Sequence, residues 1–280
     1  MIKSRQLEII KVHENTSSNV EDNLAIEEPL EIRLSFIENG KAVKKPISVT
    51  MSTPGNEVEL AIGFLYTEGI IQTFDQVSNV DVSLKNDDQV VTVSVKENVN
   101  LNLTKLDRNF YTTSSCGVCG KSSIDAIKIV IPDFGLENFN SKIPLSLIYS
   151  LPEKLKVHQN VFNQTGGLHA SAIFNINGDL IILREDVGRH NALDKLIGSC
   201  LMNDKIPLND SILLLSGRAS FELIQKASMA GVKIIVAIGA PSSLAVELAK
   251  ECNITLIGFL KNNKFNIYSL PDRIDLNNKK

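Results

Sequence analysis

Two cysteines separated by two residues are the first candidates for chemistry in this chain. Cys116 and Cys119 stand in the glycine-flanked stretch Cys116-Gly117-Val118-Cys119-Gly120, whereas Cys200 and Cys252 are isolated. Four cysteines are too few for a disulfide framework in a 280-residue chain whose first residues show no apolar export signal. The close pair therefore predicts thiol chemistry.

Four roles remain open for this pair. A structural zinc site would need further ligands, and only the distant His169, Cys200 or Cys252 could supply them. A thioredoxin-type redox site would lie between a strand and a helix, but the preceding segment 109–115 is polar and poor in strand formers. Two unreactive surface thiols are the third role. The fourth, a nucleophilic sulfur carrier, is favoured because Lys121 and a helix predicted just after it both stabilise a thiolate.

A second group of candidates lies at the ends of predicted strands in the second half of the chain. Arg189 and His190 lie between a hairpin and a predicted helix, and Ser216, Gly217 and Arg218 follow the next buried strand. In open α/β sheets, ligands gather at the carboxyl ends of strands, where helix N-termini and guanidinium groups bind phosphates. This pattern predicts a site for a phosphate-bearing ligand. The alternative is a set of surface ion pairs and helix caps.

Residues 1–110 have the pattern of a β-rich α+β region. The dipeptide Asn39-Gly40 predicts a hairpin. Asn56 and Glu59 have the spacing of a capping box and predict the start of a helix, which Gly69 ends. Alternating polarity predicts strands over 30–37, 43–51, 77–84 and 90–95.

Residues 142–280 have a different pattern, in which short apolar runs alternate with helical segments after a hairpin at Asn177-Gly178. Such runs favour a parallel sheet covered by helices on both faces, a three-layer αβα unit. Residues 111–141 are expected to form a connecting loop and helix that carry the cysteine pair. The predicted strands are 168–176, 180–183, 211–215, 232–238, 254–259 and one from 265, and the predicted helices are 191–200, 221–229 and 243–250.

Composition excludes several classes of protein. The 29 Lys and Arg residues against 32 Asp and Glu give a formal net charge of −3, so the chain is not expected to bind nucleic acid. The best apolar run, 232–238, is far shorter than the ~20 residues of a membrane span. We therefore expect a cytoplasmic protein without a membrane partner.

The element order of the second half is also that of the zinc-dependent deaminases. Their chemistry needs a Glu two residues after a zinc-binding His or Cys and a Cys-x-x-Cys at the next helix start. The matching segments here are His190-Asn191-Ala192 and Arg218-Ala219-Ser220, which lack the Glu and both Cys. We therefore expect no intrinsic metal and no zinc hydrolysis.

Together these motifs resemble the formate dehydrogenase accessory sulfurtransferases, the FdhD family, over nearly the whole chain. The upstream Cys-Gly-x-Cys-Gly and the downstream stretch 185–192 (EDVGRHNA) are a combination specific to that family. The stretches that match are 63–69 (GFLYTEG), 116–120, 165–170 (TGGLHA), 185–192, Asp194-Lys195, 216–218 (SGR) and Gly258-Phe259.

The resemblance implies a cytidine-deaminase-like αβα unit that has lost its zinc site, a homodimer, and sulfur transfer. Sulfur would arrive as a persulfide from a cysteine desulfurase. It would pass to bis-molybdopterin guanine dinucleotide, the bound substrate, for use by a formate dehydrogenase. Cys116 matches the persulfide-carrying cysteine and Cys119 its partner.

The resemblance also marks a cofactor-binding stretch near the C-terminus, namely Phe259, Leu260, Lys261, Asn262, Asn263 and Lys264. The family pattern has Arg where this chain has Lys261 and Lys264, a departure that bears on guanine-nucleotide affinity. A second hypothesis from another class is a non-catalytic chaperone that binds the molybdenum cofactor until it is inserted. A mobile glycine-flanked thiol favours transfer over holding alone.

Overall fold

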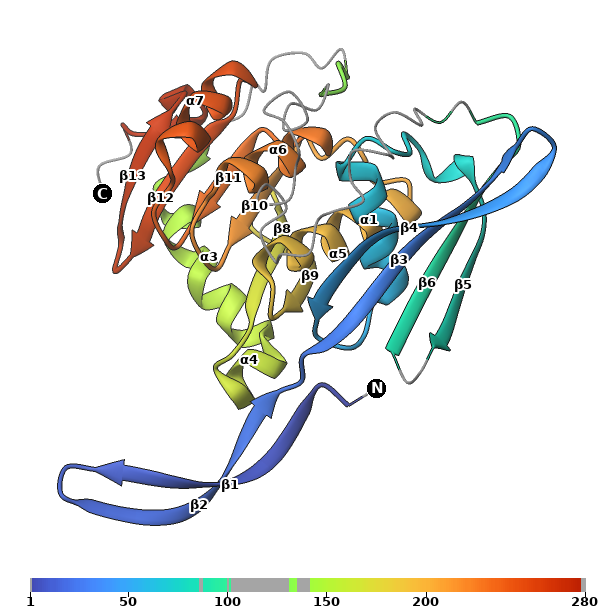
Figure 1. Cartoon of the computed structure of the whole chain (residues 1–280). Helices are drawn as coiled ribbons and strands as arrows, with labels where there is room; N and C mark the ends of the chain where they lie inside the picture. Colours follow the sequence, from blue (N-terminus) through green and yellow to red (C-terminus); the bar gives the residue numbers. More distant parts are fainter. Residues whose placement is uncertain (1, 86–87, 100, 102–130, 135–141, 278–280) are drawn as a thin grey trace.

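The computed structural model describes residues 2–85, 88–99, 101, 131–134 and 142–277 (Figure 1). Within them, a small N-terminal sheet and a larger mixed sheet lie on either side of a layer of helices. Cys116 and Cys119 lie outside the described residues, as does the helix expected after them. No helix of the described ranges is both long and apolar enough to cross a bilayer.

The N-terminal sheet has four strands in the order β4-β3-β6-β5. Asn39 and Gly40 have φ of 50° and 73°, the left-handed conformation that a tight hairpin turn requires, so the predicted hairpin is confirmed. β3 buries alternate residues against the core, while its other residues are partly exposed. The strands are β3 (Glu28–Glu38), β4 (Lys41–Ser52), β5 (Val77–Lys85) and β6 (Asp88–Val95).

An additional hairpin, which the sequence did not predict, precedes this sheet. β1 (Ser4–His13) and β2 (Thr16–Ala25) pair along their whole length and extend away from the body of the molecule (Figure 1). Most of its residues are exposed on both faces, so the hairpin lacks the one-sided apolar pattern that identifies a strand.

The larger sheet has six strands in the order β13-β12-β11-β10-β8-β9. Only the pairs β10–β11 and β11–β12 are parallel, so the prediction of a parallel sheet is wrong for the outer strands. The hairpin at Asn177-Gly178, which was predicted, makes β8 and β9 antiparallel, and a short turn at 262–263 does the same for β12 and β13. β8 also pairs antiparallel with β10. The strands are β8 (His169–Asn175), β9 (Leu180–Asp186), β10 (Ser211–Leu215), β11 (Ile234–Ala237), β12 (Thr255–Lys261) and β13 (Lys264–Ser269).

Helices cover both faces of this sheet, which makes it a three-layer unit. Alternate residues of β10 face opposite ways: Ile212 and Leu214 pack with α3, whereas Leu213 and Leu215 pack with the helices of the other face. The helices of that other face are α5 (Arg189–Met202), α6 (Phe221–Met229) and α7 (Ser243–Glu251). The helices α3 (Leu145–His158) and α4 (Asn160–Thr165) were not predicted. Shorter elements are η1 (Phe74–Gln76), η3 (Pro271–Arg273), and the paired β7 (Ile143–Pro144) and β14 (Ile274–Asp275).

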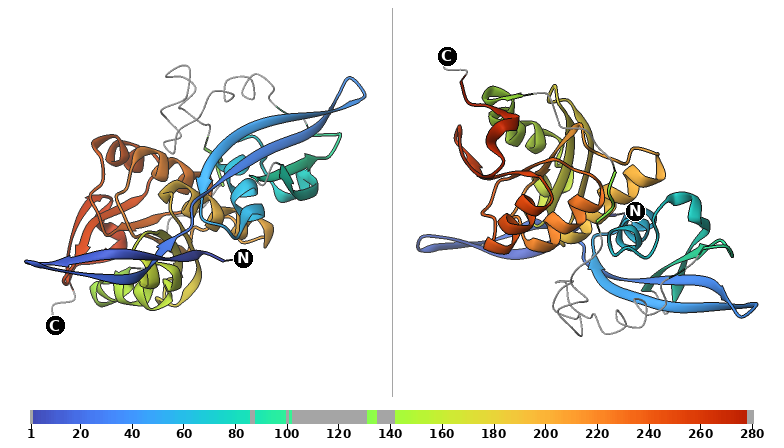
Figure 2. Two further views of the ribbon diagram at one scale, coloured as in Figure 1. Left: turned by 60° about the horizontal axis from the view of Figure 1, so that its bottom comes forward. Right: turned by 90° about the horizontal axis from the view of Figure 1, so that it is seen from above.

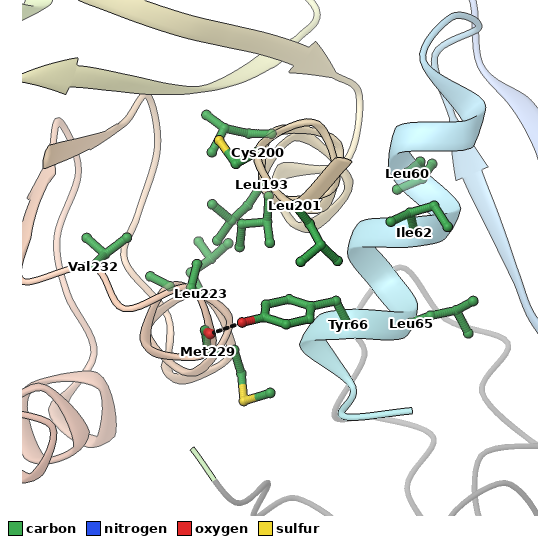
Figure 3. Close-up of a cluster of buried hydrophobic side chains, with 14 of the residues drawn as sticks. Leu60, Ile62, Leu65, Tyr66, Leu193, Cys200, Leu201, Leu223, Met229 and Val232 are labelled. Carbon is green, nitrogen blue, oxygen red and sulfur yellow. Dashed lines mark hydrogen bonds between the residues drawn. The ribbon is translucent and has the colours of Figure 1, made fainter. Parts of the chain in front are cut away.

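Helix α1 (Glu57–Thr67) joins the two sheets, because it lies between the N-terminal sheet and α5 (Figure 2). A single hydrophobic core runs from β3 through α1 to α5, α6 and β11. The hydroxyl of Tyr66 donates a hydrogen bond to the carbonyl of Met229, 2.6 Å away across this core (Figure 3). The domain boundaries 1–110, 111–141 and 142–280 stay a prediction, and the first and last of these segments share this core.

The start of α1 differs from the predicted capping box. Asn56 has φ of 68° and its side chain makes no cap hydrogen bond. The carboxylate of Glu59 instead accepts hydrogen bonds from the guanidinium of Arg184, at 2.5 and 2.7 Å. The Asn56–Glu59 box is therefore wrong, because a tertiary ion pair takes the Glu59 side chain.

Candidate functional site

Five strand ends meet at one edge of the larger sheet, which we call the carboxyl edge. Backbone hydrogen bonds connect neighbouring segments: Ser216 N donates to the Ala170 carbonyl, and Phe259 N to that of Gly239. Gly239 N in turn donates to the Gly217 carbonyl. A Cβ at Gly239 would lie 2.9 Å from that carbonyl oxygen, so the close approach requires glycine. The segments of the carboxyl edge are 165–170, 186–190, 216–220, 238–242 and 259–263.

Arg189 and Arg218 bring positive charge to this edge, as the sequence predicted. Burial, followed by the nearby Arg189 and Arg218, lowers the pKa of His169 below its usual 6.5, although Asp186 opposes the shift. The Nε of Arg189 is buried and has no hydrogen-bond partner among the described residues. These cations therefore surround a neutral imidazole at neutral pH, an arrangement suited to an anionic ligand.

His190 lies at the predicted place, and its ring contacts two side chains of the protein. Its ring is buried, and its Nε2 lies 3.4 Å from a carboxylate oxygen of Glu222 and 3.4 Å from the Ser220 hydroxyl. These contacts connect the first turn of α5 to the first turn of α6. His190 therefore positions the helix starts that carry the edge, and its ring is already engaged by protein groups.

Ser216 and Gly217 shape the backbone between the two arginines. The hydroxyl oxygen of Ser216 accepts a hydrogen bond of 2.8 Å from the Ala170 backbone, so its own proton stays available for a further acceptor. A Cβ at Gly217 would lie 3.2 Å from Nδ1 of His169. Glycine at this position lets the backbone approach the imidazole.

The stretch 259–264 contributes one aromatic ring and a turn. Phe259 is half exposed and has φ of 56°, an unusual conformation for a phenylalanine that a bulge in β12 imposes. Leu260 is 1% exposed and packs in the core with α3, so only its backbone remains available to a ligand. The exposed residues of the turn are Lys261, Asn262, Asn263 and Lys264.

A cavity of about 540 Å³ adjoins this edge, between it and the helices α3 and α4. His169 and Ser216 line it, together with Lys156 of α3, Phe162 of α4 and Ile238. Neither the cavity nor the position of His169 was predicted, because α3 and α4, which enclose the cavity, were not predicted. The available signal was the stretch 165–170, which contributes His169 and two glycines.

Three further charged residues of the same part of the chain, Asp186, Asp194 and Lys195, are buried where α5 packs against its neighbours. The ammonium of Lys195 lies 2.7 Å from the Asp186 carboxylate and donates to the Thr53 carbonyl. Lys226 lies 2.9 Å from Asp194. We call the contact between α1, α5 and α6 the seam. These ion pairs are buried and do not lie on the surface.

The seam combines buried ion pairs with close contacts between helix backbones. Burial alone would lower the pKa of Lys226, but the Asp194 and Glu68 carboxylates raise it above its usual range, so this lysine stays charged. The α1 and α5 backbones touch at two glycines. A Cβ at Gly63 would lie 1.9 Å from the Asp194 carbonyl oxygen, and one at Gly198 would lie 1.9 Å from that of Glu59.

The two described cysteines are poor nucleophiles. Burial raises the pKa of Cys200 to about 11, and burial also raises that of Cys252. Among the residues that the structure describes, no three His, Cys, Asp or Glu side chains are grouped to hold a metal ion. The predicted pair Cys116 and Cys119 lies outside the described residues.

Comparison with known proteins agrees with the motifs. The sequence model of the FdhD/NarQ family matches residues 25–275. The chain is 45% identical over 274 residues to a sulfur carrier protein FdhD of Streptomyces coelicolor, covering 96% of this chain and 94% of that protein. It is 42% identical over 270 residues to a sulfur carrier protein FdhD of Sulfurisphaera tokodaii, covering 96% and 98%.

A solved structure shows the same fold. A crystal structure described as a formate dehydrogenase accessory protein from Desulfotalea psychrophila superposes with a TM-score of 0.72. The alignment covers 98% of this chain and 100% of that chain at 23% sequence identity. This likeness establishes the mixed α/β architecture.

Proposed function

Because the chain belongs to the FdhD/NarQ family, we propose that it carries sulfur as a cysteine persulfide to a guanylylated molybdenum cofactor. Its relatives are named sulfur carrier proteins, and the family is linked to maturation of the formate dehydrogenase cofactor. The chain thus serves a formate dehydrogenase as an accessory protein. In this proposal the molybdenum cofactor is a bound substrate that is released to the client.

The proposed carrier is Cys116. Its thiolate attacks the terminal sulfur of a persulfide on a cysteine desulfurase, forming a new S–S bond while the desulfurase thiolate leaves. Cys119 would act as the partner thiol. Support comes from the two other cysteines, Cys200 and Cys252, whose raised pKa values disfavour the thiolate that such an attack needs.

The observation that carries the proposal is the grouping at the carboxyl edge. Arg189 and Arg218 suit the pyrophosphate of a dinucleotide, and the half-exposed ring of Phe259 offers a face on which a flat base can stack. Gly217 and Gly239 let a ligand approach the backbone closely. These features support a guanine-nucleotide site.

The experiment is intact-mass analysis after incubation with a cysteine desulfurase and cysteine. The wild-type chain should gain one reducible sulfur atom, and Cys116→Ser should lose this gain. Cys119→Ser should lose less, and Cys252→Ser is the matched control, which should load like the wild type. Loading of Cys116→Ser at the wild-type level would contradict the assignment.

A second candidate function is a non-catalytic chaperone that holds the cofactor until insertion. The same edge favours it, because a binding site needs no reactive thiol. The mass experiment separates the two: a holder binds guanine nucleotide but gains no sulfur.

Further parts of the proposal rest on the resemblance and on composition. We propose a homodimer in the cytoplasm, without nucleic-acid or membrane partners and without an intrinsic metal. The order of hairpin, helix, strand, helix and strand supports a deaminase-like descent for the αβα unit. The segments His190-Asn191-Ala192 and Arg218-Ala219-Ser220, which lack zinc ligands and the general acid, support loss of deaminase chemistry.

A further inference from the structure

Hydrogen bonds to other parts of the chain hold the two helices that enclose the cavity beside the carboxyl edge. The Glu185 carboxylate accepts hydrogen bonds from the backbone of Val161 and Phe162, at 3.2 and 2.9 Å, which attaches the start of α4 to β9. Lys154 of α3 donates to the carbonyl of Gly178 in the hairpin turn. Both helices that enclose the cavity are therefore held in place without a ligand.

The inner surface of the cavity is largely apolar, with few polar groups. Leu168, Ile238 and the 37% exposed ring of Phe162 supply apolar and aromatic surface. His169 adds an imidazole whose lowered pKa keeps it neutral near pH 7. An apolar pocket with a few convergent polar groups is typical of a small-molecule site.

Two opposite charges stand at the rim, one helical turn apart on α3. Glu153 and Lys156 both line the cavity and both are exposed. Neither side chain forms a hydrogen bond or an ion pair within the described part of the chain. A carboxylate can accept two parallel N–H bonds, and an ammonium can donate to a carbonyl oxygen. The rim therefore fits a flat ring with adjacent donor and acceptor edges.

We propose that this cavity binds a 2-amino-4-oxopyrimidine ring, which guanine and pterins share. The Glu153 carboxylate accepts from the ring N–H and the 2-amino group, Lys156 donates to the 4-oxo oxygen, and Phe162 covers the ring face. The inference rests on the proposed function, because the molybdenum cofactor carries both guanine and pterin rings. It gives that cofactor a second ring contact, separate from Phe259 and on the other side of Ser216.

The separation of the two contacts follows from the strand order. His169 and Ser216 of the cavity belong to β8 and the end of β10, whereas Phe259 lies on β12. β11 lies between β10 and β12, and neighbouring strands are about 4.8 Å apart. A dinucleotide lying along this edge could thus place its two ring systems at the two contacts and its phosphates near Arg218.

The test compares ligands with and without the 2-amino group. For the pterin source, the ligands are 6-hydroxymethylpterin and 6-hydroxymethyllumazine; for the guanine source, they are GDP and IDP. The full-length wild type should bind the 2-amino ligand of one pair at least tenfold more tightly, the order expected for charge-assisted hydrogen bonds. Glu153→Gln should abolish that preference, and Glu247→Gln, an exposed acid on α7, should retain it.

Each outcome decides the inference. If Glu153→Gln loses only the preference for 6-hydroxymethylpterin over 6-hydroxymethyllumazine, the cavity binds the pterin ring. If it loses only the preference for GDP over IDP, the cavity binds guanine. No preference in the wild type, or an unchanged preference in Glu153→Gln, would overturn the inference. Normal GDP affinity and sulfur loading in that case would leave the proposed function intact. Absence of GDP binding and sulfur loading from the wild type would instead contradict the proposed function.

Discussion

The seam and the carboxyl edge are built from the same stretch of sequence but have opposite character. Arg189, in the first turn of α5, belongs to the edge, whereas Asp194, Lys195 and Gly198 further along that helix belong to the seam. In the seam, Lys195 pairs with Asp186 at 2.7 Å and Lys226 pairs with Asp194 at 2.9 Å. At the edge, two arginines flank a neutral histidine beside a cavity.

Residues that are close together in one motif can have separate roles. Helical periodicity directs residues of one motif to different faces, so neighbours in sequence can serve stability and binding separately. Paired, buried charges indicate a structural role, since removing one partner leaves the other buried without compensation. Arginines near a histidine that lines a cavity favour a role in binding a ligand. Substitutions in the two regions should therefore separate stability from binding.

The largest effect is expected at the helix crossing of the seam. Gly63→Ala would place a Cβ 1.9 Å from the Asp194 carbonyl oxygen, which α1 and α5 can relieve only by moving apart. We expect a loss of more than about 4 kcal/mol in the free energy of unfolding. Urea unfolding, or loss of soluble protein, measures it.

Gly167→Ala at the edge is the matched control. A Cβ there would lie 3.5 Å from the Cβ of Ala25 and 3.9 Å from two oxygens of Thr165, all ordinary van der Waals contacts. Its unfolding midpoint should stay close to that of the wild type. Equal stability of the two variants would refute the close crossing.

The next effect concerns the buried ion pair of the seam. Lys226→Met leaves the Asp194 carboxylate buried beside Glu68 without its cation, which should cost about 3–5 kcal/mol of stability. The double variant Lys226→Met/Asp194→Asn should recover part of this loss in urea unfolding, because the uncompensated charge is gone. A single variant as stable as the wild type would mean that the pair contributes nothing.

The smallest effect is a pH dependence at the edge. The folded pKa of His169 lies below 6.5, so the unfolded state binds more protons between the two values, and stability falls as the pH drops below 6.5. His169→Gln should lose less stability than the wild type between pH 7.5 and pH 5.5, as measured by the urea midpoint. Identical pH dependence in both proteins would show that burial and the arginines together do not lower the pKa of this ring.

Local turn chemistry made part of the fold predictable. The hairpin at Asn39-Gly40, the strand 211–215 and the helix 221–229 were predicted, two of them with the observed bounds. α3 was missed because Pro152 lies inside it, and proline is the residue least compatible with a helix interior. The β1–β2 hairpin was missed because both of its faces are exposed and give no periodic pattern.

The site was predictable only where its residues follow strand ends. Arg189 and Arg218 were expected at one edge because each comes just after a strand, whereas Phe259, which lies within β12, was singled out only through the family resemblance. The partners of Asp194 and Lys195 were not predictable, since Lys226 and Thr53 are distant in sequence. These ion pairs stabilise the fold because they are buried, and they become buried only when the helices pack together.

The most direct test of the account is calorimetric titration of GDP into Arg218→Ala, with thermal unfolding of the same sample. Charge-assisted hydrogen bonds contribute about 1.5–3 kcal/mol each, so the affinity should fall about ten- to a hundredfold. The melting temperature should stay near that of the wild type, since Arg218 lies outside the seam. Unchanged GDP affinity, or a loss of affinity explained by unfolding, would contradict the carboxyl edge as the nucleotide site.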